Sequence, residues 1–277
     1  MLLSLIAAVS LLSGLGICCS CGAFSTLQWL WLLPVSFAEV FLGLVVLGFL
    51  FLLYLCKRVD QDVPQEEDSR FYRVVADLII QAAFVVLRIH VKTSGLEKVP
   101  KEGRFLLIAN HTDNSDPIIL LKCLPKSQLA FISKRENKTM FVIGPMMHKL
   151  QCQLINREND REALKTILKC IQILKEDRAS IAAFPEGGID DDLLFHHFRP
   201  GVFKIAQKAQ VPIVVCTLKN TQTVVKNIYR LKPSYTELKV LDVIPAEELK
   251  GVSTVDIANR CYEMMAADLG PELVARE

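Results

Sequence analysis

The sequence predicts an α/β protein in which a single domain, built on a largely parallel sheet flanked by helices, follows a two-helix membrane anchor. Two observations carry this prediction. From about residue 70 onward, short apolar runs alternate with helical patterns, which is typical of α/β domains with a mainly parallel sheet. Residues 1–56 differ, because Glu39 is their only charged residue and long apolar runs lie on both sides of it. A chain of 277 residues has room for both parts.

Residues 1–56 are expected to form two hydrophobic helices, near 2–19 and 35–56, with Gly22 to Pro34 as the turn between them. A spanning helix needs roughly 20 mostly apolar residues, and the alternative is that both helices lie partly in the membrane interface. A signal peptide is disfavoured because the first run lacks a positively charged start and is followed by a second apolar run. Lys57 and Arg58 follow directly, which favours an integral membrane protein with its domain on the cytoplasmic face.

The segment after the second apolar run is charged. Residues 57–69 are expected to link the anchor to a folded domain over residues 70–277. Apolar residues at helical spacing predict an amphipathic helix over 71–86, which packs on the domain or lies along the membrane surface. Strands are then expected near 88–93, 104–109, 128–132, 152–155, 180–184, 212–218 and 236–242, and helices near 115–123, 137–149, 158–175, 200–209 and 254–268.

Charge and cysteine usage exclude two classes of protein. All 32 lysines and arginines lie from residue 57 onward with 29 of the 30 acidic residues, so this part carries a formal charge near +3. That charge tolerates an anionic membrane face but does not indicate nucleic-acid binding. Five of the nine cysteines are scattered singly beside apolar residues of the domain, which predicts buried free thiols and no disulfide framework.

A polar turn follows the strand expected near 104–109. It contains Asn110 and His111, and Asp116 with Pro117 is suited to begin the next helix. Loops at strand ends are where α/β folds place their chemistry. A carboxylate on one ring nitrogen of His111 would fix the tautomer and leave the other nitrogen to accept a proton near neutral pH. The alternative is that these side chains only cap a helix.

Two further strand ends carry notable turns. Leu154-Ile155-Asn156-Arg157 places an arginine where a strand ends, and arginine is suited to bidentate phosphate contacts, although most single arginines are surface residues. Phe184-Pro185-Glu186-Gly187-Gly188 is a glycine-rich turn in which backbone N–H groups become exposed. A plain turn is the alternative for this second stretch.

Together these stretches resemble the glycerolipid acyltransferase family, whose best-known members acylate 1-acylglycerol-3-phosphate. Asn110, His111 and Asp116 match its N-H-x-x-x-x-D motif. Residues 155–157 match its I-N-R element, residues 184–187 its F-P-E-G motif, and residues 211–214 its V-P-I-V strand. The four motifs occur in the family's order, and the resemblance covers roughly residues 70–220. It implies that residues 70–277 are an acyltransferase domain of phospholipid biosynthesis.

The resemblance also implies roles for individual residues. His111, oriented by Asp116, would take the proton of the acceptor's free hydroxyl, whose oxygen would then attack the thioester of acyl-CoA or acyl carrier protein. No cofactor and no metal are implied; the expected partners are membrane lipids, a lysophospholipid acceptor and the acyl donor. Backbone N–H groups of the glycine-rich turn would hold the oxyanion. The residues expected to bind substrate are Asn110, Lys134, Asn156, Arg157, Glu186, Gly187, Gly188 and Arg199.

The chain departs from the family pattern at one point. After Gly187 it reads Gly188-Ile189-Asp190-Asp191-Asp192 in place of the usual Thr-Arg-Ser. The missing arginine leaves the acceptor open, and Lys134, ahead of Arg199 and Lys204, is expected to supply the charge. The acids at 190–192 with His196 and His197 allow a metal-site interpretation, but a solvated loop is more typical. The competing functions are a 1-acylglycerol-3-phosphate acyltransferase, an acyltransferase for another lipid acceptor, and a membrane-bound lipid-binding protein with a degenerate site.

Overall fold

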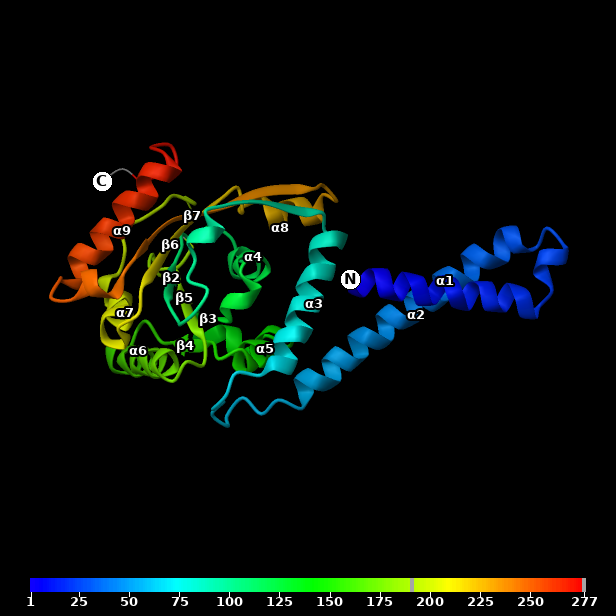
Figure 1. The fold of residues 1–277 in the computed structure, drawn as a ribbon, viewed down its shortest axis with the longest axis horizontal. Coiled ribbons are helices and arrows are strands. Elements are labelled where there is room, and N and C mark those ends of the chain that lie inside the picture. Colours follow the sequence, from blue (N-terminus) through cyan, green and yellow to red (C-terminus); the bar gives the residue numbers. More distant parts are fainter. Residues whose placement is uncertain (190–191, 276–277) are drawn as a thin grey trace. The chain divides into compact units, whose positions relative to one another are not determined.

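The computed structural model of the protein describes residues 1–189 and 192–275. They form two compact units, Met1–Asp62 and Val63–Glu277. The first unit is a helical hairpin of α1 (Leu2–Ser20) and α2 (Trp29–Lys57) (Figure 1). The helices pack closely where a Cβ on Gly14 would lie 3.1 Å from Oγ of Ser36. Small residues at such a contact allow two backbones to approach each other.

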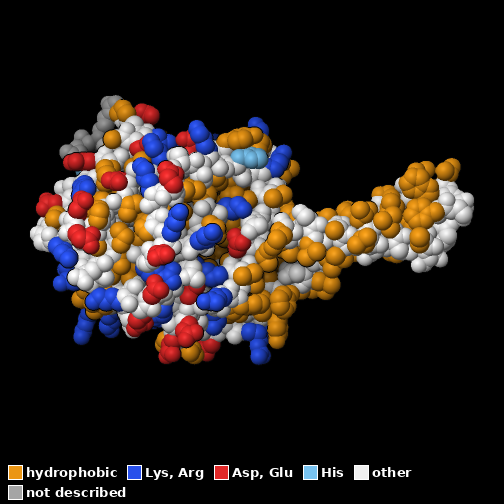
Figure 2. All heavy atoms as spheres, in the orientation of Figure 1, with side chains coloured by type: hydrophobic (Ala, Val, Ile, Leu, Met, Phe, Trp, Pro, Cys, Tyr) orange, Lys and Arg blue, Asp and Glu red, His pale blue; other side chains and the backbone are white. Residues whose placement is uncertain are grey.

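Both helices of the hairpin are long and apolar enough to cross a membrane. Most of their large apolar side chains are exposed, and they cover the hairpin in Figure 2. The expected turn from Gly22 to Pro34 is wrong in its second half, because α2 begins at Trp29 and contains Pro34. A proline near the start of a helix disturbs few hydrogen bonds, so the apolar residues before it join the helix.

The second unit is an α/β domain on one seven-stranded sheet (Figure 1). The strand order is β1-β7-β6-β2-β5-β3-β4, and every neighbouring pair is parallel except β6 and β7. The predicted fold class, a largely parallel sheet flanked by helices, is therefore confirmed. The strands are β1 (Ile89–Ser94), β2 (Leu106–Ile108), β3 (Leu129–Lys134), β4 (Gln153–Ile155), β5 (Ser180–Ala183), β6 (Ile213–Lys219) and β7 (Ser234–Ile244).

Helices cover both faces of the sheet and enclose two apolar cores. One core lies between the sheet and α6, α7 and α9, and the other between the sheet and α3 and α4. The helices of this unit are α3 (Arg70–Val86), α4 (Asp116–Cys123), α5 (Ile143–Lys149), α6 (Asp160–Lys175), α7 (Lys204–Ala209), α8 (Thr223–Tyr229) and α9 (Thr254–Leu269).

Three helices differ from the sequence prediction. The helix expected over 137–149 is a 3₁₀ turn, Arg135–Thr139, followed by α5, because Pro145 fits only the first turn of a helix. The helix expected over 200–209 is likewise a 3₁₀ turn, Pro200–Phe203, followed by α7. Helix α8 was not predicted, because it is only seven residues long and rich in β-branched side chains.

Helix α3 packs on the domain through Phe84 and Arg73. The Arg73 guanidinium forms an ion pair with Asp68 at 2.9 Å and donates to the backbone carbonyls of Gln128, Leu129 and Leu150. The residues before α3 also lie on the domain, because Gln151 donates to the carbonyls of Gln65 and Glu67. The second half of the expected linker is thus attached to the folded unit.

Candidate active site

Asn110 fixes the point at which the chain leaves β2. Its Nδ2 donates to the carbonyl of Leu218 in β6 over 2.9 Å, and its Oδ1 accepts the Leu218 N–H over 2.7 Å. The side chain is 2% exposed, so its amide is committed to the scaffold. By joining β2 to β6 at their carboxyl ends, Asn110 positions His111, the next residue.

His111 and Asp116 meet across the turn between β2 and α4. Nδ1 of His111 lies 2.9 Å from Oδ2 of Asp116, and the same oxygen accepts the backbone N–H groups of Thr112 and Asp113 over 2.8 and 2.9 Å. Asp116 is fully buried at the start of α4, where the helix dipole favours a negative charge. With its carboxylate on Nδ1, the ring presents Nε2, which has no hydrogen-bond partner among the described residues.

Glu186 joins the turn after β5 to the His111 loop. Its Oε1 accepts the His111 N–H over 2.8 Å, and its Oε2 accepts the His196 N–H over 3.1 Å. Phe184, two residues earlier, stacks on the His111 ring with centroids 4.1 Å apart. Both side chains hold His111 in place, so Glu186 orders the loop, while its expected contact with substrate stays a prediction.

Two arginines lie against the glycine-rich turn, and Gly187 allows the closer approach of the two. Gly187 has a φ of +91°, which favours glycine, and a Cβ there would lie 2.8 Å from Nε of Arg199. A Cβ on Gly188 would lie 3.6 Å from Nη1 of Arg157. Loss of solvation, and then the positive charge of Arg199, lower the pKa of Arg157. Two guanidinium groups this close favour an anion, and their geometry suits phosphate.

The other predicted substrate-binding residues are less closely associated with His111. Lys134 is exposed at the end of β3, where its register partner in β4 is Ile155. Its side chain forms no ion pair or hydrogen bond among the described residues, so the expected role of Lys134 in substrate binding stays a prediction. Asn156 uses its side chain locally, donating to Glu162 over 2.9 Å and accepting the N–H of Glu158 over 3.1 Å.

The acidic segment after Gly188 is only partly described. Asp190 and Asp191 lie outside the described residues, while Asp192 pairs with Nε2 of His196 at 2.9 Å. The hydrogen bond from His196 lowers the pKa of Asp192. Within residues 1–189 and 192–275, the structure places no three histidine, cysteine or acidic side chains together in an arrangement that could hold a metal ion.

All nine cysteines are free, and the thiols buried in the α/β domain are unsuited to form an acyl-enzyme. Burial raises the pKa of the Cys123 and Cys152 thiols to about 11 and that of Cys170 to about 12. The thiolate, which is the nucleophilic form, is therefore strongly disfavoured at neutral pH.

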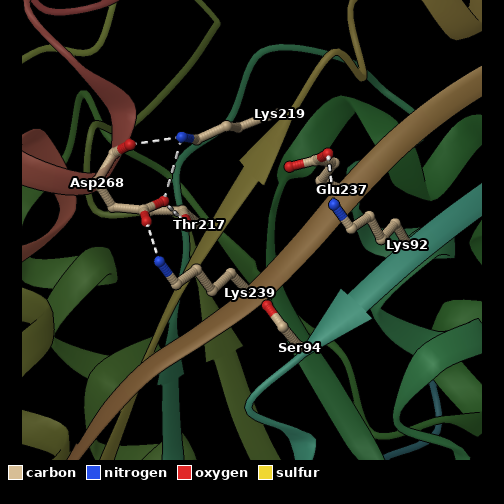
Figure 3. Close-up of a pocket in the computed structure, with 7 residues that line it drawn as sticks. All are labelled: Lys92, Ser94, Thr217, Lys219, Glu237, Lys239 and Asp268. Carbon is tan, nitrogen blue, oxygen red and sulfur yellow. Dashed lines mark hydrogen bonds and ion pairs between the residues drawn. The ribbon is translucent and has the colours of Figure 1, made fainter.

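A hollow of about 280 Å³ lies elsewhere, between β1, β7, β6 and α9 (Figure 3). Its charged side chains are paired with each other: Asp268 lies 2.5 Å from Lys239 and 3.4 Å from Lys219, and Lys92 lies 3.7 Å from Glu237. None of the residues that line this hollow is among the residues described above around His111. The Asp268 pairs therefore hold α9 against the sheet, and the Lys92–Glu237 pair joins β1 to β7.

Two further contacts of the site, besides those of Asn110, Glu186 and Arg199, were not predicted from sequence. One is the stacking of Phe184 on His111, although Phe184 lies in a motif that was recognised. The other joins Oγ1 of Thr112 to Oγ1 of Thr221 over 2.8 Å, which ties the His111 loop to the segment just before α8. Thr221 is 109 residues from Thr112 and lies in no motif, so only the pairing of β2 with β6 reveals it.

These side chains form one cluster: a histidine paired with a buried aspartate, and two arginines beside a glycine-rich turn. Residues 90–219, a little under half of the chain, match the family described as Acyltransferase, so this segment is an Acyltransferase domain. The family predicted from the motifs is thereby confirmed.

Individual relatives agree with this assignment. The chain is 30% identical over 179 residues to a probable 1-acyl-sn-glycerol-3-phosphate acyltransferase of Mycoplasma pneumoniae, covering 63% of this chain and 64% of the relative. It is 26% identical over 188 residues to the 1-acyl-sn-glycerol-3-phosphate acyltransferase of Saccharomyces cerevisiae, covering 67% and 61%. It thus spans a little over three fifths of the length of these relatives.

A solved structure has the same fold. The crystal structure of the 1-acyl-sn-glycerophosphate (LPA) acyltransferase from Thermotoga maritima superposes with a TM-score of 0.58 at 20% sequence identity. The match covers 77% of this chain and 86% of the other. This similarity supports the architecture described above.

Proposed function

We propose that the protein transfers a fatty acyl group from acyl-CoA or acyl carrier protein to the free hydroxyl of 1-acylglycerol-3-phosphate, which gives phosphatidic acid. The observation that carries the proposal is the His111–Asp116 pair on a domain of the acyltransferase family. The names of the Mycoplasma and yeast relatives point to the same acceptor.

The transfer needs one base and one oxyanion donor. Nε2 of His111 takes the hydroxyl proton while the acceptor oxygen attacks the thioester carbonyl, and Asp116 stabilises the imidazolium that results. The C–S bond then breaks, and the departing thiolate takes the proton from the His111 imidazolium to leave as a thiol. The N–H of Gly187 donates to the Phe184 carbonyl over 3.2 Å, which leaves the N–H of Gly188 as the oxyanion donor.

The acceptor phosphate is assigned to Arg157 and Arg199. Both guanidinium groups lie against Gly187-Gly188, so the phosphate would bind beside the turn that supports His111. Arg199 then supplies the charge that the family usually carries in the Thr-Arg-Ser segment. Lys134, expected to be the first choice for this role, lies one strand further from β2 than β5 does and serves at most as an outer contact.

The acceptor also explains the apolar hairpin. A lysophospholipid resides in the bilayer, and two helices able to cross a membrane keep the enzyme on it. Lys57 and Arg58 at the end of α2 favour the cytoplasmic face for the α/β domain, where acyl-CoA and acyl carrier protein would be available.

An acceptor panel tests this proposal. The purified full chain receives long-chain acyl-CoA or acyl carrier protein with 1-acylglycerol-3-phosphate, 1-acylglycerol or 1-acylglycerophosphocholine, and products are measured by mass spectrometry. We expect phosphatidic acid to form with the highest kcat/KM, and to form equally well in the presence of a chelator. A preference for either other acceptor would assign a different substrate, as the altered sequence after Gly187 allows. Binding of all three acceptors without turnover would reveal a lipid-binding protein.

A further inference from the structure

An exposed surface of mixed apolar and basic side chains lies at the end of α3 and in the segment after α8. We call it the docking surface and define it by six residues: Val86, Arg88, Tyr229, Arg230, Leu231 and Lys232. Tyr229 is 84% exposed and Leu231 81%, the highest values among the large hydrophobic residues that the structure describes in this domain. Val86 is 64% exposed as well, and a group of exposed apolar side chains rimmed by polar residues, unlike a single one, indicates an interaction surface.

The two segments of the docking surface lie side by side. The Arg88 guanidinium donates to the carbonyl of Leu231, and the N–H of Ser234 donates to the carbonyl of Arg88 over 3.1 Å. The register of β1 with β7 continues this contact by pairing Ile89 with Ser234. Figure 2 shows hydrophobic and basic side chains gathered together over this end of β1, β7 and α8.

The positive charge of the docking surface is not balanced locally. Residues 78–96 and 219–236 contain no aspartate or glutamate. Among the described residues, no ion pair involves Arg88, Arg230 or Lys232, although all three are exposed. The lysines of the nearby hollow are different, because Lys92 and Lys239 each have an acidic partner (Figure 3).

We propose that the docking surface binds the anionic headgroups of a phospholipid bilayer. Tyrosine and leucine side chains favour the boundary between headgroups and acyl chains, and the three cations beside them favour lipid phosphates. The chain itself carries two helices able to cross a membrane, so a bilayer is the anionic surface that this domain encounters.

Docking at this place turns the catalytic edge of the sheet toward the lipid. Strand β7 is antiparallel to β6, and β1 is parallel to β7, so the starts of β1 and β7 lie at the edge where β2, β5 and β6 end. The Thr112–Thr221 hydrogen bond joins the His111 loop to the segment that leads into α8. The orientation of the catalytic edge toward the lipid rests on the proposed function. The binding of the docking surface to a bilayer does not.

Hydrogen exchange of the full chain in lipid nanodiscs tests the proposal without an activity assay. We expect peptides covering residues 84–90 and 223–235 to exchange about tenfold more slowly in discs that contain anionic phospholipid than in zwitterionic discs, the factor given when nine domains in ten are docked. Salt should reduce the difference. The double variant Arg230→Glu/Lys232→Glu should lose it, while Arg161→Glu/Lys165→Glu on the exposed side of α6 should keep it.

Two controls keep the outcome decisive. Unchanged exchange of β5 and α6 peptides shows that a variant is folded, and Tyr229→Ser/Leu231→Ser, which leaves the charges intact, should reduce the protection as well. Equal exchange in both disc types, or protection that survives the charge reversal, would overturn the proposal. Protection that rises with protein concentration on either lipid would assign the surface to a second copy of the chain and overturn it too.

Discussion

The two parts of the sheet differ in where they place polar side chains. One part consists of the five parallel strands β6, β2, β5, β3 and β4, and the other is a two-stranded extension formed by β1 and β7. In the parallel part, every strand ends at one edge, and that edge carries His111, Asp116, Glu186 and Arg157. In the extension, which runs the other way, polar side chains pair across the sheet or face solvent. Strand direction thus decides where the side chains of the proposed active site gather.

The comparison also separates two kinds of buried charge. Asp116 in the parallel part receives hydrogen bonds from two backbone N–H groups and one histidine, which organises a reactive side chain. Asp268, opposite the extension, receives them from Thr217 and Lys239, which only attaches α9. Removing each group should therefore affect different properties of the protein.

The largest effect is expected for Asp116→Asn. The amide cannot stabilise an imidazolium, so we predict that kcat falls by about 10²–10⁴-fold, the usual contribution of an acid–base group. Asp242→Asn on β7, an exposed acid of the extension, should keep the wild-type kcat. The kcat of both variants is measured by steady-state acyl transfer. Comparable losses of kcat in the two would show that the extension contributes to catalysis as much as the parallel part does.

Arg73→Met should give the largest loss of stability. The variant leaves Asp68 and three backbone carbonyls without their partner, and removing one member of a buried ion pair costs about 3–5 kcal/mol. Arg88→Met, next to the extension, removes an exposed side chain and should cost less than about 1 kcal/mol. The free energies of unfolding of the two variants are compared by denaturant unfolding in detergent. Similar losses would contradict the conclusion that Arg73 attaches α3 to the domain.

Arg157→Ala and Arg199→Ala should each reduce kcat/KM for 1-acylglycerol-3-phosphate by about 10–100-fold, the value of one charged hydrogen-bond partner. With 1-acylglycerol, which lacks the phosphate, neither variant should differ from the wild type. Arg260→Ala on α9, whose partner is Glu248, is the matched control. Equal losses of kcat/KM with both acceptors would show that Arg157 and Arg199 do not bind the acceptor phosphate.

Asp268→Asn should have the smallest effect, about 1–2 kcal/mol of unfolding free energy at pH 7. Burial raises the pKa of Asp268, but hydrogen bonds from Lys239 and Thr217 and the charge of Lys219 lower it further, so its net shift is downward. Its contribution is complete above the unfolded pKa of about 3.9 and disappears as the pH falls through the lowered value. The gap between wild type and variant should therefore close below about pH 4, as measured by thermal unfolding; a constant gap would contradict this.

The sequence predicted what is local and missed what depends on strand pairing. His111 and Asp116 are five residues apart in one turn, so their pairing could be expected from spacing and side-chain chemistry. The bonds from Glu186 to His111 and from Asn110 to Leu218 link residues 75 and 108 positions apart, and they exist only because β5 and β6 both flank β2. Arg199 was recognised as a charge, but its position beside Gly187 required the fold of the intervening loop.

The most direct test of the account compares His111→Ala with His90→Ala in single-turnover acyl transfer to 1-acylglycerol-3-phosphate. His111 lies at the carboxyl end of β2, while His90 lies on β1 of the extension. We predict that His111→Ala loses about 10²–10⁴-fold in rate with its melting temperature unchanged, and that His90→Ala keeps the wild-type rate. A folded His111→Ala variant that retains the wild-type rate would contradict the assignment of the base and, with it, the catalytic role of this edge of the sheet.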